Sequence, residues 1–139
     1  MGKSVRDAMT SNPCTIDADK PVAHAAKMMQ QENVGVAPIV QGDRLVGTLT
    51  DRDIVVRVVA QGKDPKTVTA REVATTQVIT VDPEENLDEA LRLMAAHQVR
   101  RLPVVEEDGR VVGVLAQADV AEEAKAKMTG EMVEEISRR

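Results

Sequence analysis

The sequence contains no phenylalanine, tryptophan or tyrosine among its 139 residues. Proteins that bind single-stranded nucleic acid usually stack the bases on aromatic rings and line the groove with basic side chains. This chain has no such rings and carries a formal net charge of −5, so we expect no nucleic-acid partner. A planar ligand would have to be held by aliphatic side chains, proline and backbone groups.

Cysteine and long apolar runs are also scarce. Cys14 is the single cysteine, which excludes an intramolecular disulfide, and we expect it to be a small, partly buried apolar residue. No apolar run approaches the roughly 20 residues that span a bilayer, and the amino terminus lacks the apolar core of a secretory signal. We therefore expect a cytoplasmic protein with no membrane partner.

Signals of catalysis are missing as well. The sequence has no Ser/His/Asp set, no phosphate-binding Gly-rich loop with lysine and no paired general base. His24 and His97 are its two histidines, and no cluster of His, Cys and Asp stands at the spacing of metal ligands. We expect no catalytic residues, no metal site and no enzyme activity.

An internal repeat organises the chain. Residues 5–40 align with residues 70–105 at a constant offset, and the match continues after one inserted residue. A repeat of this length is a complete supersecondary unit. We expect copies at 4–60 and 70–121, a Gly- and Pro-containing linker at 61–69 and an amphipathic helical tail at 122–139. Identical pairs include Arg6/Arg71, Thr10/Thr75, Thr15/Thr80, Pro38/Pro103, Gly47/Gly113 and Asp53/Asp119.

Each copy reads as strand, helix, strand, strand, helix. Short apolar segments at 14–16 and 78–81 predict the first strands. Apolar residues at helical spacing predict the first helices, and apolar runs around polar turns predict hairpins at 36–49 and 102–115. The second helices start near residues 51 and 117. The fold class is therefore α/β (α+β), with two β-α-β-β-α repeats packed as a pseudo-twofold pair. The helical stripes are Val22, Ala25, Ala26 and Met29, and Leu87, Ala90, Leu91 and Met94.

Three stretches give the chain a family resemblance. Residues 47–53 (Gly-Thr-Leu-Thr-Asp-Arg-Asp) follow a pattern of glycine, a hydroxyl residue and a later aspartate, 113–119 is its counterpart, and 99–105 is similar to a second strand. Repeated in register, these stretches resemble the tandem CBS-domain pair, or Bateman module. Residues 49–56 and 97–105 are most similar to stand-alone actinobacterial CBS pairs of the hypoxic response protein type.

The resemblance implies a non-catalytic regulatory module. Such modules bind adenosyl ligands in clefts between the repeats: AMP, ADP or ATP and, with lower preference, NAD or S-adenosylmethionine. No cofactor is required, and a disc-like homodimer with an unidentified protein target is implied. The alternative is a structural dimerisation or adaptor protein with a vestigial cleft and no small-molecule ligand.

Thr50 and Asp53 are the sharpest pair of candidate residues. The resemblance implies that the Thr50 hydroxyl faces phosphate and that Asp53 accepts from ribose hydroxyls. A carboxylate has two oxygens and the ribose diol two donors, and the start of a helix offers backbone N–H groups to phosphate. The same Thr-x-x-Asp pattern also caps helices, so both interpretations stay open.

The second copy departs from the pattern, because Ala116 has no hydroxyl while Asp119 remains. Arg100 and Arg101 would point to opposite faces of a strand. The resemblance implies that basic residues here reach phosphate, to which arginine can donate two bonds; surface ion pairs are the alternative.

The resemblance implies that the remaining candidates contact the adenine ring of the ligand. The alternative for all of them is that they simply pack in the core. Residues 36–38 and 102–103 would flank the ring, and the first strands would bond its edge. The complete predicted ligand set is Thr15, Ile16, Val36, Ala37, Pro38, Thr50 and Asp53 in the first copy, and Thr80, Val81, Arg100, Arg101, Leu102, Pro103 and Asp119 in the second.

Overall fold

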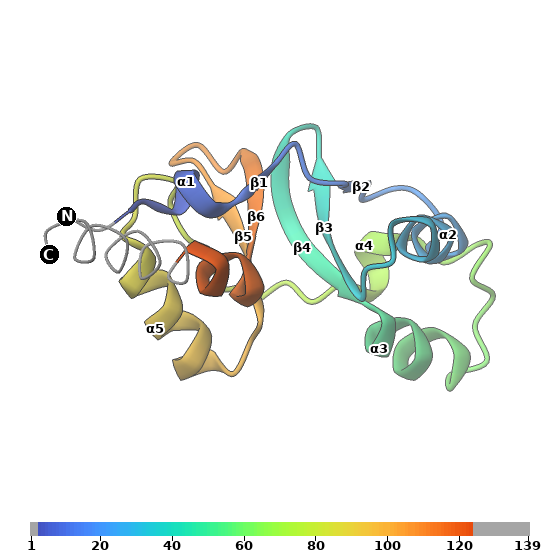
Figure 1. Ribbon diagram of the computed structural model, residues 1–139. Coiled ribbons are helices and arrows are strands. Elements are labelled where there is room, and N and C mark those ends of the chain that lie inside the picture. Colours follow the sequence, from blue (N-terminus) through green and yellow to red (C-terminus); the bar gives the residue numbers. More distant parts are fainter. Residues whose placement is uncertain (1–2, 124–139) are drawn as a thin grey trace, which may run out of the picture. The chain divides into compact units, whose positions relative to one another are not determined.

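The computed structural model describes residues 3–123 (Figure 1). The chain divides into two compact units, each with its own three-stranded sheet and apolar core. Among the described residues, the Asp53 unit comprises Asn12–Val78 and Val105–Val111, and the Asp119 unit comprises residues 3–11, 79–104 and 112–123. Helices and strands are mixed in both units, which confirms the expected α+β class with two copies.

The Asp53 unit is built on the sheet β2-β3-β4. Strand β2 runs parallel to β3, and β3 pairs antiparallel with β4 across a turn at Gly42, whose φ of 64° places it in the left-handed region. The elements are β2 (Ile16–Asp17), α2 (Val22–Glu32), β3 (Val36–Gln41), β4 (Arg44–Thr50), α3 (Asp51–Ile54), the π-helical turn η1 (Val55–Val59) and α4 (Ala70–Val73).

The Asp119 unit is built on the sheet β1-β6-β5. Strands β5 and β6 are joined by a turn at Gly109, with φ of 91°, and the turn residues belong to the Asp53 unit. A helix over 117–123 follows β6 and runs to the last described residue. The elements are α1 (Val5–Ala8), β1 (Thr10–Ser11), α5 (Leu87–His97), β5 (Arg101–Val105) and β6 (Val111–Ala116).

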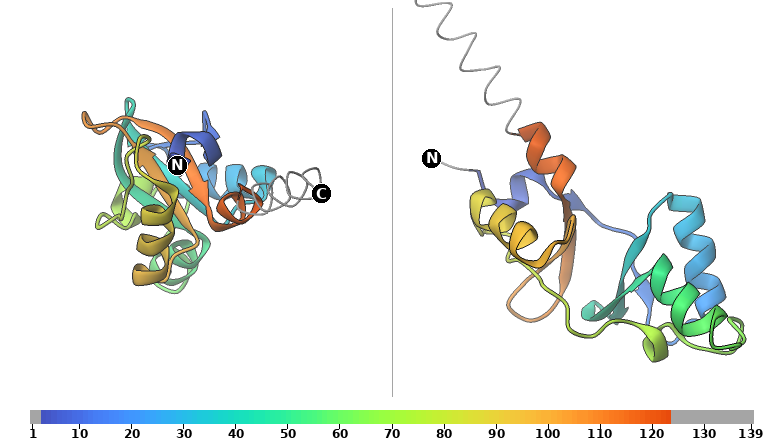
Figure 2. Two further views of the ribbon diagram at one scale, coloured as in Figure 1. Left: turned by 60° about the vertical axis from the view of Figure 1, so that its left-hand side comes forward. Right: turned by 90° about the horizontal axis from the view of Figure 1, so that it is seen from below.

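Each unit takes a short segment from the start of the other sequence copy. Segment α1–β1 lies along β6 in the Asp119 unit, with Thr10 opposite Val114 (Figures 1 and 2). The equivalent segment after α4 lies along β4 in the Asp53 unit, where Thr75 and Thr48 exchange two backbone hydrogen bonds of 2.8 and 2.9 Å. The predicted boundaries 4–60, 61–69 and 70–121 describe the repeat in the sequence and stay a prediction.

The two glycines of the repeated motif allow this close approach. A Cβ atom on Gly47 would lie 2.7 Å from the carbonyl oxygen of Thr75, and one on Gly113 would lie 2.6 Å from Met9 Sδ and 2.9 Å from the carbonyl oxygen of Thr10. Any side chain at either position would push the added segment off its strand.

The helical stripes are narrower than predicted. Ala25, Met29, Ala90 and Met94 are buried, as are the first residues of both stripes, but Ala26 and Leu91 are exposed. Leu91 keeps 40% of its surface exposed. The fully buried positions of each stripe therefore stand at spacing i, i+3 and i+7, and the fourth position is exposed.

The first strands are shorter than predicted. Of the segment 78–81, Val81 alone forms a bridge, to Val104, and the first copy has a strand at 16–17 rather than 14–16. In each copy a proline stands next to the paired residue of the neighbouring strand. Pro103 accepts from the Val81 N–H at 3.1 Å, but proline has no N–H to continue a ladder.

The predicted tail over 122–139 lies outside the described residues apart from residues 122 and 123. Cys14 is exposed, so the expectation that it is partly buried was wrong. In the part of the chain that the structure describes, no helix is long and apolar enough to cross a bilayer.

Candidate functional site

The junction between β4 and α3 forms a closed capping box. The Thr50 N–H donates to Asp53 Oδ2 at 3.0 Å, and the Asp53 N–H donates to Thr50 Oγ1 at 2.9 Å. These bonds satisfy two backbone donors that an isolated helix start leaves unpaired. The capping interpretation of Thr-x-x-Asp is therefore confirmed, and α3 begins where the sequence predicts.

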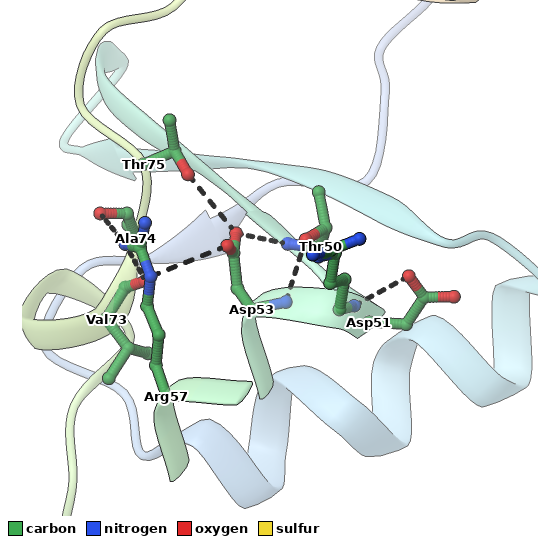
Figure 3. A network of polar contacts seen from close by, with 8 residues as sticks. Thr50, Asp51, Asp53, Arg57, Val73, Ala74 and Thr75 are labelled. Carbon is green, nitrogen blue, oxygen red and sulfur yellow. Dashed lines mark hydrogen bonds and ion pairs between the residues drawn. The ribbon is translucent and has the colours of Figure 1, made fainter. Parts of the chain in front are cut away.

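The Asp53 carboxylate has two further partners, shown in Figure 3. Thr75 Oγ1 donates to Oδ2 at 3.4 Å, and Arg57 Nε lies 3.8 Å from Oδ1. The Arg57 guanidinium also donates from Nη1 to the backbone carbonyls of Val73 at 3.1 Å and Ala74 at 3.4 Å. Asp53 is 9% exposed, so the carboxylate lies at the edge of the interior in a polar network that joins α3, η1 and the 73–75 segment.

The start of α3 does not offer its backbone N–H groups to phosphate, as the sequence led us to expect. The Asp51 N–H donates to the Gly35 carbonyl at 3.0 Å, and the Arg52 N–H donates to Asp51 Oδ1 at 2.8 Å. The N–H groups of Thr50 and Asp53 are used within the capping box. A phosphate at this corner would therefore meet the Thr50 hydroxyl proton rather than backbone donors.

The sheet register sorts the other first-copy candidates by face. Val36 pairs with Thr50 and Pro38 with Thr48. Side chains alternate along a strand, so Val36 and Pro38 lie on the same face of the sheet as Thr50.

Two first-copy candidates lie in the core of the Asp53 unit. Ala37 and Ile16 are each 1% exposed and belong to its core cluster. Their side chains are committed to packing, so a ligand contact at these two positions would have to use backbone atoms.

Thr15 is half-buried and lines an open depression of about 230 Å³ in the Asp53 unit. The volume is below the range of about 300–1,000 Å³ that small-molecule pockets occupy. Thr50 and Asp53 do not line it, and we judge the corner at Thr50 to be the stronger candidate because its polar groups converge. The depression is lined by Asn12, Pro13, Thr15, Val40, Gly42, Asp43 and Val111.

The Asp119 unit repeats part of this arrangement. The Ala116 N–H donates to Asp119 Oδ2 at 3.1 Å, and the Gln117 N–H donates to the Arg100 carbonyl at 2.8 Å. Ala116 has no hydroxyl to return the bond or to donate to a ligand. Asp119 is half-buried, and within residues 3–123 its carboxylate has the Ala116 N–H as its one hydrogen-bond donor.

The two arginines differ from the expected pair of strand residues. Arg100 directly precedes β5 and Arg101 is its first residue, so the expectation that the two side chains point to opposite faces of a strand stays a prediction. Both are exposed, and neither guanidinium forms an ion pair within residues 3–123. The alternative of surface ion pairs therefore has no support in the described part of the chain.

The other second-copy candidates are largely buried. Leu102 is 0% and Val81 4% exposed, and both belong to the core cluster of the Asp119 unit. Pro103 is buried and Thr80 is exposed. Each unit contains seven of the predicted ligand residues. They are Thr15, Ile16, Val36, Ala37, Pro38, Thr50 and Asp53 in the Asp53 unit, and Thr80, Val81, Arg100, Arg101, Leu102, Pro103 and Asp119 in the Asp119 unit.

Two residues of the network were missed by sequence reasoning. Arg57 stands four residues after Asp53, a spacing at which opposite charges meet on a helix, so a signal was present. Thr75 matches Thr10 in the repeat, but nothing in the sequence indicates that it contacts Asp53.

Among residues 3–123 no group of three or more His, Cys, Asp and Glu side chains could hold a metal ion. Partial desolvation raises the pKa of the Cys14 thiol above its ordinary value, and the nearby Glu32 carboxylate raises it further.

Comparisons with known proteins agree with the repeat. The CBS domain model matches residues 5–60 and 70–126. The chain is 42% identical over 118 residues to the CBS domain-containing protein YhcV of Bacillus subtilis, covering 85% of this chain and 83% of YhcV. It is 40% identical over 119 residues to Hypoxic response protein 1 of Mycobacterium tuberculosis, covering 85% and 82%.

Three solved structures are similar. Hypoxic Response Protein I, solved with two coordinated zinc ions, has a TM-score of 0.79 and 39% identity, covering 87% of this chain and 98% of that one. CBSX2 in complex with AMP has a TM-score of 0.80 and 26% identity, covering 91% and 99%. The CBS domain pair of MJ0100 with 5′-methylthioadenosine and S-adenosyl-L-methionine has a TM-score of 0.78 and 30% identity, also covering 91% and 99%.

Proposed function

The chain belongs to the CBS-domain family and contains two copies of the domain, and we propose that it is a non-catalytic regulatory module that binds an adenosine nucleotide. AMP, ADP or ATP is the preferred ligand class, with NAD and S-adenosylmethionine as lower preferences. The proposed setting is the cytoplasm. Similar structures hold AMP in one case and 5′-methylthioadenosine with S-adenosyl-L-methionine in another, which supports the adenosine moiety as the shared feature.

The observation that carries the proposal is the corner formed by Thr50 and Asp53. The Thr50 oxygen accepts from the Asp53 N–H, which leaves its proton able to donate to a phosphate. Asp53 Oδ1 has the Arg57 contact at 3.8 Å, which is longer than a hydrogen bond. The corner therefore presents one donor suited to phosphate and one acceptor suited to a ribose hydroxyl.

The two copies would differ in affinity. The Asp119 unit lacks the hydroxyl because Ala116 replaces threonine, and a hydrogen bond to a charged group contributes about 1.5–3 kcal/mol. We therefore propose that the Asp53 unit binds the nucleotide more tightly, with the Thr50 hydroxyl donating to the phosphate and Asp53 accepting from the ribose. Arg100 and Arg101 are proposed as cations for phosphate.

Equilibrium dialysis against AMP and then ATP tests the proposal. The protein has no aromatic residues, so ultraviolet absorbance reports bound adenine with little contribution from the protein. We expect saturable binding at micromolar concentration and a loss of about tenfold or more in Asp53→Asn. Asparagine keeps an amide oxygen for the capping bond but places an NH₂ group at the second position. No binding up to millimolar concentration would refute the proposal for these ligands and favour a structural adaptor.

We also propose that the protein forms a homodimer that acts on a separate protein target. Val55, Val56 and Val59 of η1 are 57%, 46% and 64% exposed. Three exposed valines on one short helical turn form an apolar surface of the kind that protein contacts cover. Sedimentation velocity of the wild-type protein gives the oligomeric state directly, and a monomer at every concentration would refute the dimer.

A further inference from the structure

Within the described residues, Asp53 is the one charged side chain that is buried, and its two oxygens are used unequally. Oδ2 accepts from the Thr50 N–H at 3.0 Å and from the Thr75 hydroxyl at 3.4 Å. Two donors occupy both lone pairs of that oxygen. Within residues 3–123, Oδ1 has the Arg57 ion pair as its one polar contact, at 3.8 Å.

The orientation of this carboxylate would be loose without its outer partners. The terminal torsion of an aspartate side chain is broad, unlike the staggered torsions nearer the backbone. The Thr50 N–H alone fixes the position of one oxygen but leaves the plane of the group free to turn. A second contact to Oδ2 and a charge beside Oδ1 define that plane.

Arg57 is itself held in place by the backbone. Its Nη1 donates to the carbonyl of Val73 at 3.1 Å and to that of Ala74 at 3.4 Å, and its Nε faces Asp53 Oδ1. The planar guanidinium of arginine can contact the backbone carbonyls and the Asp53 carboxylate at the same time. A lysine ammonium on a flexible side chain does this less well. Thr75 follows directly on the same 73–75 segment, so one stretch of chain sets both contacts (Figure 3).

We propose that Thr75 and Arg57 are positioning residues for ribose recognition: they hold the Asp53 carboxylate so that Oδ1 is the oxygen that accepts from a ribose hydroxyl. The inference rests on the proposed nucleotide-binding function. It replaces the expectation that both carboxylate oxygens meet the ribose diol, because Oδ2 is already occupied.

Binding of two nucleotides can show whether Thr75 and Arg57 position the Asp53 carboxylate or only stabilise the fold. AMP and 2′,3′-dideoxyadenosine 5′-monophosphate differ only in the hydroxyl groups that Asp53 would contact. Equilibrium dialysis of both would be run on wild-type protein, Thr75→Val, Thr75→Ser and Arg57→Met. Thr76→Val and Arg44→Met are matched controls, since both residues are exposed and neither belongs to the network around Asp53.

We expect Thr75→Val and Arg57→Met to weaken AMP binding by about 3- to 10-fold and to leave binding of the dideoxy nucleotide within twofold of the wild-type value. Thr75→Ser keeps the hydroxyl and should restore AMP binding, and the control variants should bind as wild type does. Far-UV circular dichroism checks that each variant is folded.

Two results would overturn the inference alone: wild-type AMP affinity in Thr75→Val, or an equal loss for both nucleotides, which would indicate a purely structural role. Absence of both AMP and ATP binding to the wild-type protein would refute the proposed function for these ligands, and this inference with it.

Discussion

Replacing Gly47 with alanine should detach the 73–75 segment from β4. A Cβ atom at this position would lie 2.7 Å from the Thr75 carbonyl oxygen and 3.2 Å from the Ala74 Cβ. The first of these atoms belongs to the backbone and is fixed by the hydrogen bonds of 2.8 and 2.9 Å between Thr48 and Thr75. The clash can be relieved only if the segment moves and these bonds lengthen.

The cost follows from the contacts that are lost. Overpacking a tight site costs about 1–3 kcal/mol, and each weakened hydrogen bond adds up to about 0.5–1.5 kcal/mol. We expect the free energy of unfolding of Gly47→Ala to fall by about 2–4 kcal/mol, measured by urea denaturation with far-UV circular dichroism. Because Thr75 also contacts Asp53, AMP affinity should fall in the same variant.

Gly35→Ala is the matched control for this prediction. The atoms nearest to a Cβ on Gly35 belong to the side chain of Asp51, the first of them at 3.2 Å, and this exposed carboxylate can turn away. We expect a loss below about 1 kcal/mol, in the range of ordinary surface changes. Equal losses in the two variants would refute the argument that Gly47 makes room for a neighbouring strand.

Three further outcomes follow from the structure. Asp53→Ala removes the side-chain half of the capping box, in which Asp53 Oδ2 accepts from the Thr50 N–H, and should lower the free energy of unfolding by about 1–2 kcal/mol, more than Asp53→Asn does in the same urea titration. The Cys14 thiol has a raised pKa, so the rate of its alkylation by iodoacetamide should reach half its maximum at a higher pH than in a free cysteine peptide. Glu32→Gln should lower the pH of this midpoint. An unchanged midpoint would contradict the contribution of Glu32 to the raised pKa. Val59→Lys places a charge on the exposed turn η1 and should shift the proposed dimer towards monomer in sedimentation velocity, with unfolding free energy within about 0.5 kcal/mol of wild type; unchanged stoichiometry would count against this surface.

Much of the fold is predictable because its signals are local. Helical spacing of apolar residues and glycine at the hairpin turns are each legible within a few positions, and the repeat gives a second, independent copy of every signal. By contrast, local signals do not predict that the segment at the start of each sequence copy pairs within the unit formed by the other copy. This pairing depends on contacts between positions far apart in the chain, such as Thr48 with Thr75, and only the glycines at 47 and 113 mark the close approach.

The candidate site was predictable in part. The Thr50–Asp53 pair is visible because the spacing of a capping box is fixed. Whether its backbone donors stay available depends on nearby acceptors, and Gly35 and Asp51 supply them here. The network around Asp53 also involves Thr75, which no spacing rule connects with it.

The most direct test of the central claim locates the ligand by the amide resonances of isotope-labelled protein during a titration with AMP. The amides of Thr50 and Asp53 should shift, saturate with the dissociation constant found by dialysis, and move more than those of Ala116 and Asp119. Shifts confined to other residues, or no shifts at millimolar AMP, would contradict the assignment of this corner as a nucleotide site.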